Sequence, residues 1–451
     1  MEDQGQYEGK RWKALALLCV AQFMVILDAS IVNVALPTIG DALDFSQEDL
    51  SWVINGYVLT FGGFLLLGGR LADLLGRRRM FITGLLVFAL ASLAGGFAQT
   101  DIQLIIARAI QGLGAAIVSP AALSIITTTF KEGSERNKAL GAWGAVAGSG
   151  GAAGVLLGGV LTDGLGWEWV LWVNVPIGLI TAYLAPRLVA ESRSEGERRI
   201  FDFPGAVAIT AGLSVLVYAI VDAEKSGWGS TKTIFLLALA GVLIAAFIAI
   251  ESRAKAPLVP FRIFRLRTLT GSNIVGLLLG ASLFSMFFLA TLYMQQVLGY
   301  SPIKTGLSYV PLSFGIILSA GIGSQVATKI GFKPVLIVGM VLVTIALVWW
   351  SAISPDGGYV TDVLGPSVVA AVGLGLAFVP VTIGAVAGVE DRESGLASGL
   401  INTSQQIGGA LGLAILATIA NSTSEGPLAA ATSPDAAAAA LTEGFQDAFR
   451  A

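Results

Sequence analysis

Residues 69–79 read GRLADLLGRRR and follow directly on an apolar run. This stretch combines one carboxylate, Asp73, with four arginines, and a related stretch, SQVATKIGFKP, returns at residues 324–334. Gly76 of the first copy corresponds to Gly331 of the second. A copy of a charged loop far along the chain indicates two related halves.

Two further pairs of segments keep the same order. GLGAAIVSP (112–120) is echoed by GLGLAFVP (373–380), and RNKALG (136–141) by RESGLA (392–397). Each echo lies eight predicted helices after its original. We therefore predict two six-helix bundles separated by two inserted helices.

The composition is that of a membrane protein. The chain has 451 residues, of which 55% are hydrophobic and 13% charged, and its mean hydropathy is +0.79. Soluble domains carry about 25% charged residues. Apolar runs of about 20 residues recur, which is the length that crosses a bilayer as a helix. The predicted all-α, polytopic fold has thirteen spans, at 14–36, 50–69, 80–98, 104–129, 139–161, 169–190, 204–222, 233–251, 269–294, 306–327, 334–352, 363–387 and 395–420.

The distribution of basic residues predicts the topology. With a cytoplasmic N-terminus, 22 of the 27 lysines and arginines fall in cytoplasmic segments, as the positive-inside rule requires. The predicted domains are an N-terminal bundle, two inserted helices with their loops, five helices of the C-terminal bundle, and an extracytoplasmic loop: 12–190, 191–268, 269–420 and 421–451. A fourteenth helix is expected beyond residue 451.

Several classes of chemistry find no support in the sequence. The chain has no histidine and one cysteine, Cys19, which excludes histidine metal sites and an internal disulfide. No nucleotide-binding fingerprint or metal-ligand spacing is present. We expect no enzymatic activity, cofactor, metal or nucleic-acid partner.

Two charged residues stand inside predicted spans. Asp28 lies in FMVILDASIVNVALP (23–37) and Arg108 in the fourth span, where a charge costs about 2.5–3.5 kcal/mol. A dry site favours a neutral carboxyl group, and a nearby arginine favours the charged form. Arginine keeps its proton, so it can act only on an anionic partner. We predict that Asp28 and Arg108 couple transport to protons; the alternative is that Asp28 is a structural hydrogen-bond acceptor.

These stretches resemble motifs of the major facilitator superfamily, in its fourteen-helix drug:proton antiporter branch. The signature after the second span stands as Gly69, Leu71, Ala72, Asp73, Gly76, Arg77 and Arg78. The first-span motif stands as Asp28, Ser30 in place of threonine, Asn33, Ala35, Leu36 and Pro37. The fourth-span motif stands as Arg108, Gln111, Gly112, Gly114 and Ala116.

The resemblance implies a conformational latch between the halves. Gly69, Asp73, Gly76, Arg77 and Arg78 would form this latch with the start of the last predicted span, near Ser394. Thr328 replaces the aspartate in the second copy, so a second latch would be weaker.

The resemblance also implies an antiporter glycine motif in the fifth span. The glycines of this motif are Gly154, Gly158 and Gly159, but Val155 stands where the family has proline. We therefore expect no proline kink at that point.

Polar and aromatic residues in apolar spans are candidates for a substrate cavity, although each could equally serve helix packing. They are Asn33, Gln111, Trp143, Phe287, Tyr293, Asn402 and Gln405. A cavity of this kind suits lipophilic, often cationic compounds. The predicted function is a proton-coupled exporter working by alternating access in a bacterial cell membrane, functional as a monomer. A lipid or siderophore exporter of the same fold, and a membrane receptor or scaffold, are the alternatives.

Overall fold

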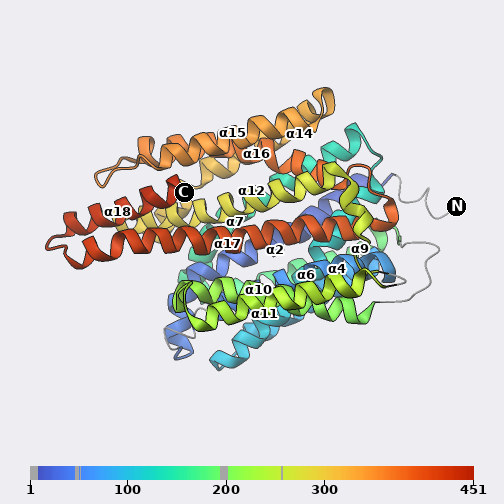
Figure 1. The fold of residues 1–451 in the computed structure, drawn as a ribbon, viewed down its shortest axis with the longest axis horizontal. Helices are drawn as coiled ribbons and strands as arrows, with labels where there is room; N and C mark the ends of the chain where they lie inside the picture. Colours follow the sequence, from blue (N-terminus) through green and yellow to red (C-terminus); the bar gives the residue numbers. More distant parts are fainter. Residues whose placement is uncertain (1–8, 46–49, 51, 193–201, 255–256) are drawn as a thin grey trace.

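The computed structural model describes residues 9–45, 50, 52–192, 202–254 and 257–451, and every regular element within these ranges is a helix. Most helices run side by side along the longest axis of the molecule (Figure 1). A helix is the form expected of apolar runs in a bilayer, because it satisfies its own backbone N–H and C=O groups.

The first half is a bundle in which α4 packs on α6, α5 on α6, and α2 on α7. Its helices are α2 (Arg11–Ala42), α4 (Trp52–Leu75), α5 (Arg77–Gly95), α6 (Asp101–Thr129), α7 (Ser134–Leu165), the short α8 (Trp169–Trp172) and α9 (Asn174–Leu188). Gly76 joins α4 to α5 with φ 110°, a conformation that favours glycine. This sharp turn places the charged stretch at one end of the bundle.

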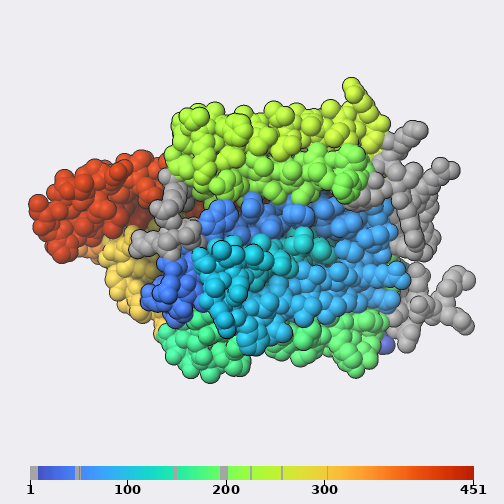
Figure 2. Space-filling view, turned by 90° about the horizontal axis from the view of Figure 1, so that it is seen from below, coloured from blue at the N-terminus to red at the C-terminus, as the bar shows by residue number. Residues whose placement is uncertain are grey.

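Two further helices, α10 (Phe203–Ser226) and α11 (Thr231–Glu251), form a hairpin. The Asp202 side chain caps α10 by accepting from the Gly205 N–H at 3.0 Å. Figure 2 shows this hairpin as an outer layer along the bundle. Helix α10 packs on α4 of the first half and on α17 of the second.

The second half repeats the pairings of the first: α14 packs on α16, α15 on α16, and α12 on α17. Its helices are α12 (Arg267–Leu292), α13 (Pro302–Ser308), α14 (Val310–Ile330), α15 (Phe332–Trp350), α16 (Gly365–Val386) and α17 (Ser394–Ala429). Short segments join them: η1 (Phe261–Arg265), η2 (Tyr293–Val297), η3 (Tyr359–Leu364) and η4 (Asp391–Glu393).

Residues 421–451, which we expected to form a loop, are largely helical. Helix α17 continues to Ala429, and α18 (Pro434–Arg450) folds back on it. One side of α18 is apolar and buried, with the Phe449 ring stacked on Trp350 at 5.7 Å between centroids. Alanine is the best helix former, so a polar, alanine-rich segment forms a helix once an apolar stripe has a surface to cover.

The number of spans also differs from the prediction. Twelve helices of the described residues are long and apolar enough to cross a membrane, not thirteen. The difference falls on the span predicted at 139–161. Helix α7 has 32 residues, but some side chains between 147 and 152 lie outside the described part, and the remaining apolar stretch, Ala153–Leu165, is shorter than a span.

Candidate functional site

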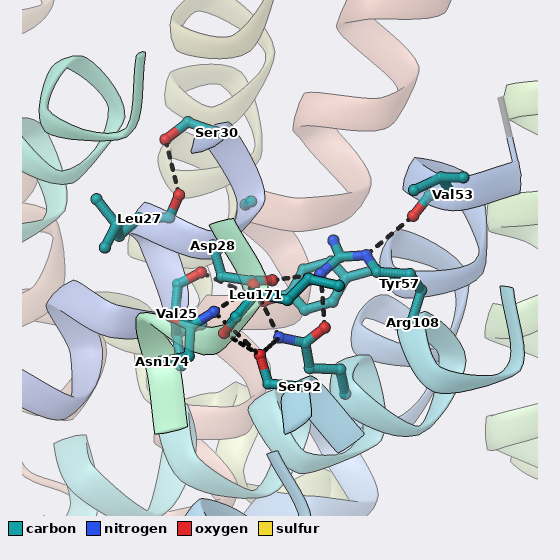
Figure 3. Close-up of polar contacts among 12 residues, drawn as sticks. Val25, Leu27, Asp28, Ser30, Val53, Tyr57, Ser92, Arg108, Leu171 and Asn174 are labelled. Atoms are coloured by element: carbon teal, nitrogen blue, oxygen red, sulfur yellow. Dashed lines mark hydrogen bonds and ion pairs between the residues drawn. The ribbon is translucent and has the colours of Figure 1, made fainter. Parts of the chain in front are cut away.

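Asp28 and Arg108 form an ion pair inside the first half (Figure 3). Arg108 Nη1 lies 2.6 Å from Asp28 Oδ2, and the two side chains are 1% and 0% exposed. Asp28 comes from the middle of α2 and Arg108 from α6, two helices that pack together. The two residues predicted to act together are thus in direct contact.

Two uncharged amide side chains, from α6 and α9, also bind the Asp28 carboxylate. Gln111 Nε2 and Asn174 Nδ2 donate to Asp28 Oδ1 at 2.7 and 2.8 Å. Both amides also donate to Ser92 Oγ, at 3.1 and 3.2 Å. Ser92 Oγ in turn donates to the carbonyl of Leu171 at 2.7 Å. The carboxylate therefore faces donors on both oxygens (Figure 3).

The Arg108 guanidinium is held from several sides. Its Nε donates to the Val53 carbonyl at 3.0 Å, and its Nη1 to Gln111 Oε1 at 2.7 Å. It lies over the Tyr57 ring, 4.5 Å from the centroid. A buried arginine with an aromatic face and fixed acceptors keeps one orientation.

This arrangement limits which group can change its charge. Arginine keeps its proton in proteins, so Asp28 is the member of the pair that can gain or lose one. Removing one partner of a buried ion pair costs about 3–5 kcal/mol, because the other charge is left uncompensated. The ion pair therefore contributes to the packing of α2 on α6.

The sequence analysis did not single out Asn174, Ser92 or Tyr57. Asn174 stands in the apolar run VLWVNVPIGLI, which is the same signal that marked Asp28. Gln111 was predicted to line a substrate cavity, but it is fully buried beside Asp28. Gln111 lies on the same face of α6 as Arg108, which stands three residues earlier.

A second polar cluster, the α4–α17 latch, joins the two halves. Asp73 Oδ1 accepts from Arg77 Nη2 at 2.8 Å and from the Gly395 N–H at 3.0 Å. Asp73 Oδ2 accepts from the Leu396 N–H at 3.0 Å, and Arg77 also donates to the Asp391 carbonyl. The start of α17 is thus bound by the end of α4, close to the predicted Ser394.

The other residues of the predicted latch support this contact. A Cβ at Gly69 or at Gly395 would collide with the backbone of the other residue, so both must be small. Gly76 makes the turn into α5. Arg78 donates to the Val189 carbonyl at 3.1 Å, which ties the same turn to the end of α9.

The corresponding seam between α7 and α14 is held without charge. Asn137 Nδ2 donates to Thr328 Oγ1 at 2.9 Å, and Ser324 Oγ donates to the Asn137 carbonyl at 2.6 Å. Thr328 is the residue that replaces the aspartate of the first copy. It makes one hydrogen bond across the halves where Asp73 makes two to backbone N–H groups.

The glycine motif of α7 lies against α2. A Cβ at Gly154 would collide with Ser30, and one at Gly158 would lie 2.8 Å from the Ile31 carbonyl. Gly159 faces Ile303 at a wider distance, 3.5 Å. Helix α7 runs unbroken through Val155, as expected without proline.

The remaining cavity candidates come from five helical segments. Trp143 and Tyr293 are buried against protein, and the Tyr293 hydroxyl donates to the Ser354 carbonyl at 2.7 Å. Packing between helices explains these two large side chains. The more accessible candidates are Asn33 on α2, Phe287 on α12, and Asn402 and Gln405 on α17, and the last two helices pack on each other.

The described residues contain no group of three acidic, histidine or cysteine side chains that could hold a metal ion.

The sequence model of the Major Facilitator Superfamily matches residues 18–413 of the chain. The chain belongs to the Major Facilitator Superfamily. It is a multi-pass membrane transporter and not an enzyme.

Several known proteins are similar to this superfamily member. The cephamycin export protein CmcT of Amycolatopsis lactamdurans is 42% identical over 92% of this chain and 86% of its own length. The puromycin resistance protein of Streptomyces alboniger is 40% identical over 97% of this chain and 87% of its own. In fold, the human organic anion transporter TETRAN matches with a TM-score of 0.66 at 15% identity, over 98% of both chains.

Proposed function

We propose that this protein is a proton-coupled exporter of lipophilic small molecules in a bacterial cell membrane. The observation that carries the proposal is the buried pair of Asp28 and Arg108, 2.6 Å apart within the first half. Ionisable residues inside membrane spans are costly, and they mark ion and substrate pathways. Asp28 binds a proton from the outside and releases it to the cytoplasm, which drives the exchange.

The relatives support the substrate class. Two of them, 42% and 40% identical, are named for the export of cephamycin and for resistance to puromycin. Cephamycin and puromycin are antibiotics. The motifs around Asp28, Asp73 and Arg108 support a place in the drug:proton antiporter branch. The substrates of this chain are then antibiotics or related metabolites, among which lipophilic cations suit an Asp28 that attracts positive charge.

The α4–α17 latch supports a conformation closed on the cytoplasmic side. The distribution of basic residues supports a cytoplasmic N-terminus and a cytoplasmic end of α4. At that end, α4 binds α17 through Asp73, and α7 binds α14 through Asn137. Alternating access requires both seams to part when the cavity opens inward. A single chain contains both halves, so the monomer suffices.

The test is proton-driven efflux of puromycin and of ethidium, a lipophilic cation, from proteoliposomes. Asp28→Asn keeps the shape of the side chain and abolishes its proton binding, so efflux driven by a pH gradient should be lost. Asp435→Asn is the matched control, because Asp435 is exposed on α18. Wild-type rates of pH-driven efflux in Asp28→Asn would disprove the coupling role.

A further inference from the structure

Asn174 has a buried acceptor that no described residue uses. Its side chain is fully buried, and its Nδ2 donates to Asp28 Oδ1 and to Ser92 Oγ. Its Oδ1 has no hydrogen-bond partner among the described residues. Buried polar atoms are nearly always paired, so an unpaired amide oxygen next to a titratable carboxylate calls for an explanation.

Protonation of Asp28 creates a conflict of donors. The charged carboxylate accepts from Arg108 on Oδ2 and from Gln111 and Asn174 on Oδ1. A proton from water that binds Oδ1 turns this oxygen into an O–H donor, while the charge of Arg108 is unchanged. The new donor then faces two N–H groups, and it needs an acceptor.

Arg108 and Gln111 cannot supply this acceptor. A guanidinium has donors alone. The Gln111 amide is fixed in its orientation, because its Oε1 accepts from Arg108 Nη1 at 2.7 Å. If this amide turned over, the Gln111 NH2 group would face the Arg108 Nη1–H donor, and neither could accept a hydrogen bond.

The Asn174 amide can turn over about its Cβ–Cγ bond, because its Oδ1 has no hydrogen bond to lose. A half-turn about its Cβ–Cγ bond would bring Oδ1 to the place of Nδ2, 2.8 Å from Asp28 Oδ1. Nδ2 would move to a position where Oδ1 now has no described partner. The Ser92 hydroxyl has one proton, so it would donate to Asn174 Oδ1 in place of the Leu171 carbonyl.

We propose that Asn174 is a positioning residue that accommodates the proton on Asp28, its amide donating to the carboxylate and accepting from the protonated carboxyl. The inference rests on the proposed role of Asp28 in proton coupling. The titratable groups facing Asp28 in the described structure are Arg108 from α6 and Tyr57 from α4. The other neighbours, Ser92 on α5 and Asn174 on α9, are uncharged.

Infrared spectroscopy of the purified full chain in nanodiscs tests the proposal without a substrate. The protonated-carboxyl band that Asp28→Asn removes is followed as the pH is varied. Asn174→Leu takes away the acceptor of the protonated form and one of three donors to the charged form. The loss of the acceptor lowers the pH midpoint of the band, and the loss of the donor raises it. The proposal expects a fall, and a rise would show that Asn174 acts as a donor alone.

Asn174→Asp has a side chain of equal size, and it should raise the pH midpoint of the band. It provides a second measurement in case Asn174→Leu does not fold. A second carboxyl next to Asp28 shares its proton, so the band should persist to a pH higher by about one unit or more. Asn273→Leu on α12 is the matched control, since Asn273 bonds to Leu269 and Ser404 in the other half. Its midpoint should equal that of the wild type.

The outcomes separate this inference from the proposed function. If Asp28→Asn leaves the spectrum unchanged at every pH, Asp28 does not titrate, and both the coupling role and this inference fail. If Asp28→Asn removes the band but both Asn174 variants keep the wild-type midpoint, the role of Asn174 alone is overturned.

Discussion

The Asp73 carboxylate on α4 accepts the backbone N–H of Gly395 at 3.0 Å, so a residue of one half caps a helix of the other. The Leu396 N–H binds the second carboxylate oxygen at 3.0 Å. Helix N-termini carry unpaired N–H groups and a partial positive charge, which a carboxylate satisfies. This cap exists only while α4 and α17 touch. Its formation and the closing of this end of the transporter are therefore one event.

Gly395→Ala should weaken the closed state. The added Cβ would collide with the Gly69 carbonyl and lie 2.6 Å from Asp73 Oδ1. Overpacking costs about 1–3 kcal/mol, so the ratio of closed to open molecules should fall about 5- to 150-fold. Distances between spin labels at Lys131 and Lys329 report this ratio.

Gly426→Ala provides the control for this change. Gly426 lies on the same helix, and a Cβ there meets nothing within 4 Å. An unchanged distance distribution in Gly395→Ala would show that the close approach of the two glycines does not control closing.

The buried ion pair should make Asp28 and Arg108 energetically interdependent. Arg108→Gln leaves Asp28 without its cation and should lower the free energy of unfolding by about 3–5 kcal/mol. The double variant Asp28→Asn/Arg108→Gln removes both charges and should recover most of this loss. Thermal unfolding of the purified variants, treated as a double-mutant cycle, measures the coupling. Additive effects would mean that the pair contributes little to stability.

The uncharged seam between α7 and α14 should be the weaker of the two. Thr328→Val keeps the shape of the side chain and removes the acceptor for Asn137 Nδ2. One hydrogen bond is worth about 0.5–1.5 kcal/mol, so the ratio of closed to open molecules should fall about two- to tenfold. Asp73→Asn, measured with the same spin labels, should have the larger effect. The reverse order would contradict the assignment of the main latch to Asp73.

Helix α18 should depend on one aromatic contact. Phe449 is 5% exposed and stacks on Trp350. Phe449→Ala should cost about 3–5 kcal/mol of local stability and release α18 from the bundle. Hydrogen exchange of the α18 amides should then rise well above the wild-type rate. Ala439→Ser, on the exposed side of α18, should leave the exchange rate unchanged.

The sequence predicted site residues where a side chain is energetically costly in its surroundings. Asp28 and Arg108 were found because charges in apolar runs are rare, and Asp73 because it stands beside four arginines. The sequence predicts that Asp73 lies near Ser394, but it does not predict the hydrogen bond from the Gly395 N–H to Asp73. Asn174 was missed because an amide in an apolar run is cheaper than a charge, so its signal is weaker.

Other features depend on tertiary packing. The apolar face of α18 is buried only because it packs against Trp350, which lies far away in the sequence. The alanine-rich sequence alone therefore predicts a loop. The burial of two cavity candidates could not be predicted either: Trp143 and Tyr293 are aromatic residues in apolar helices, and periodicity does not distinguish a packed ring from a substrate contact.

Helix α10 gives the transporter two unlike sides in the plane of the membrane. It lies close to α4 at Gly63, where a Cβ would collide with Ser214, and it reaches α17 through the apolar residues around Leu213 and Leu396. The Trp228 indole donates to Thr418 Oγ1 at 2.9 Å and closes the same flank toward the other end of α17. Acyl chains cannot reach the junction of α4 and α17 while α10 stays in place. A compound dissolved in the bilayer must therefore displace α10 to enter on this flank, or approach the centre from elsewhere.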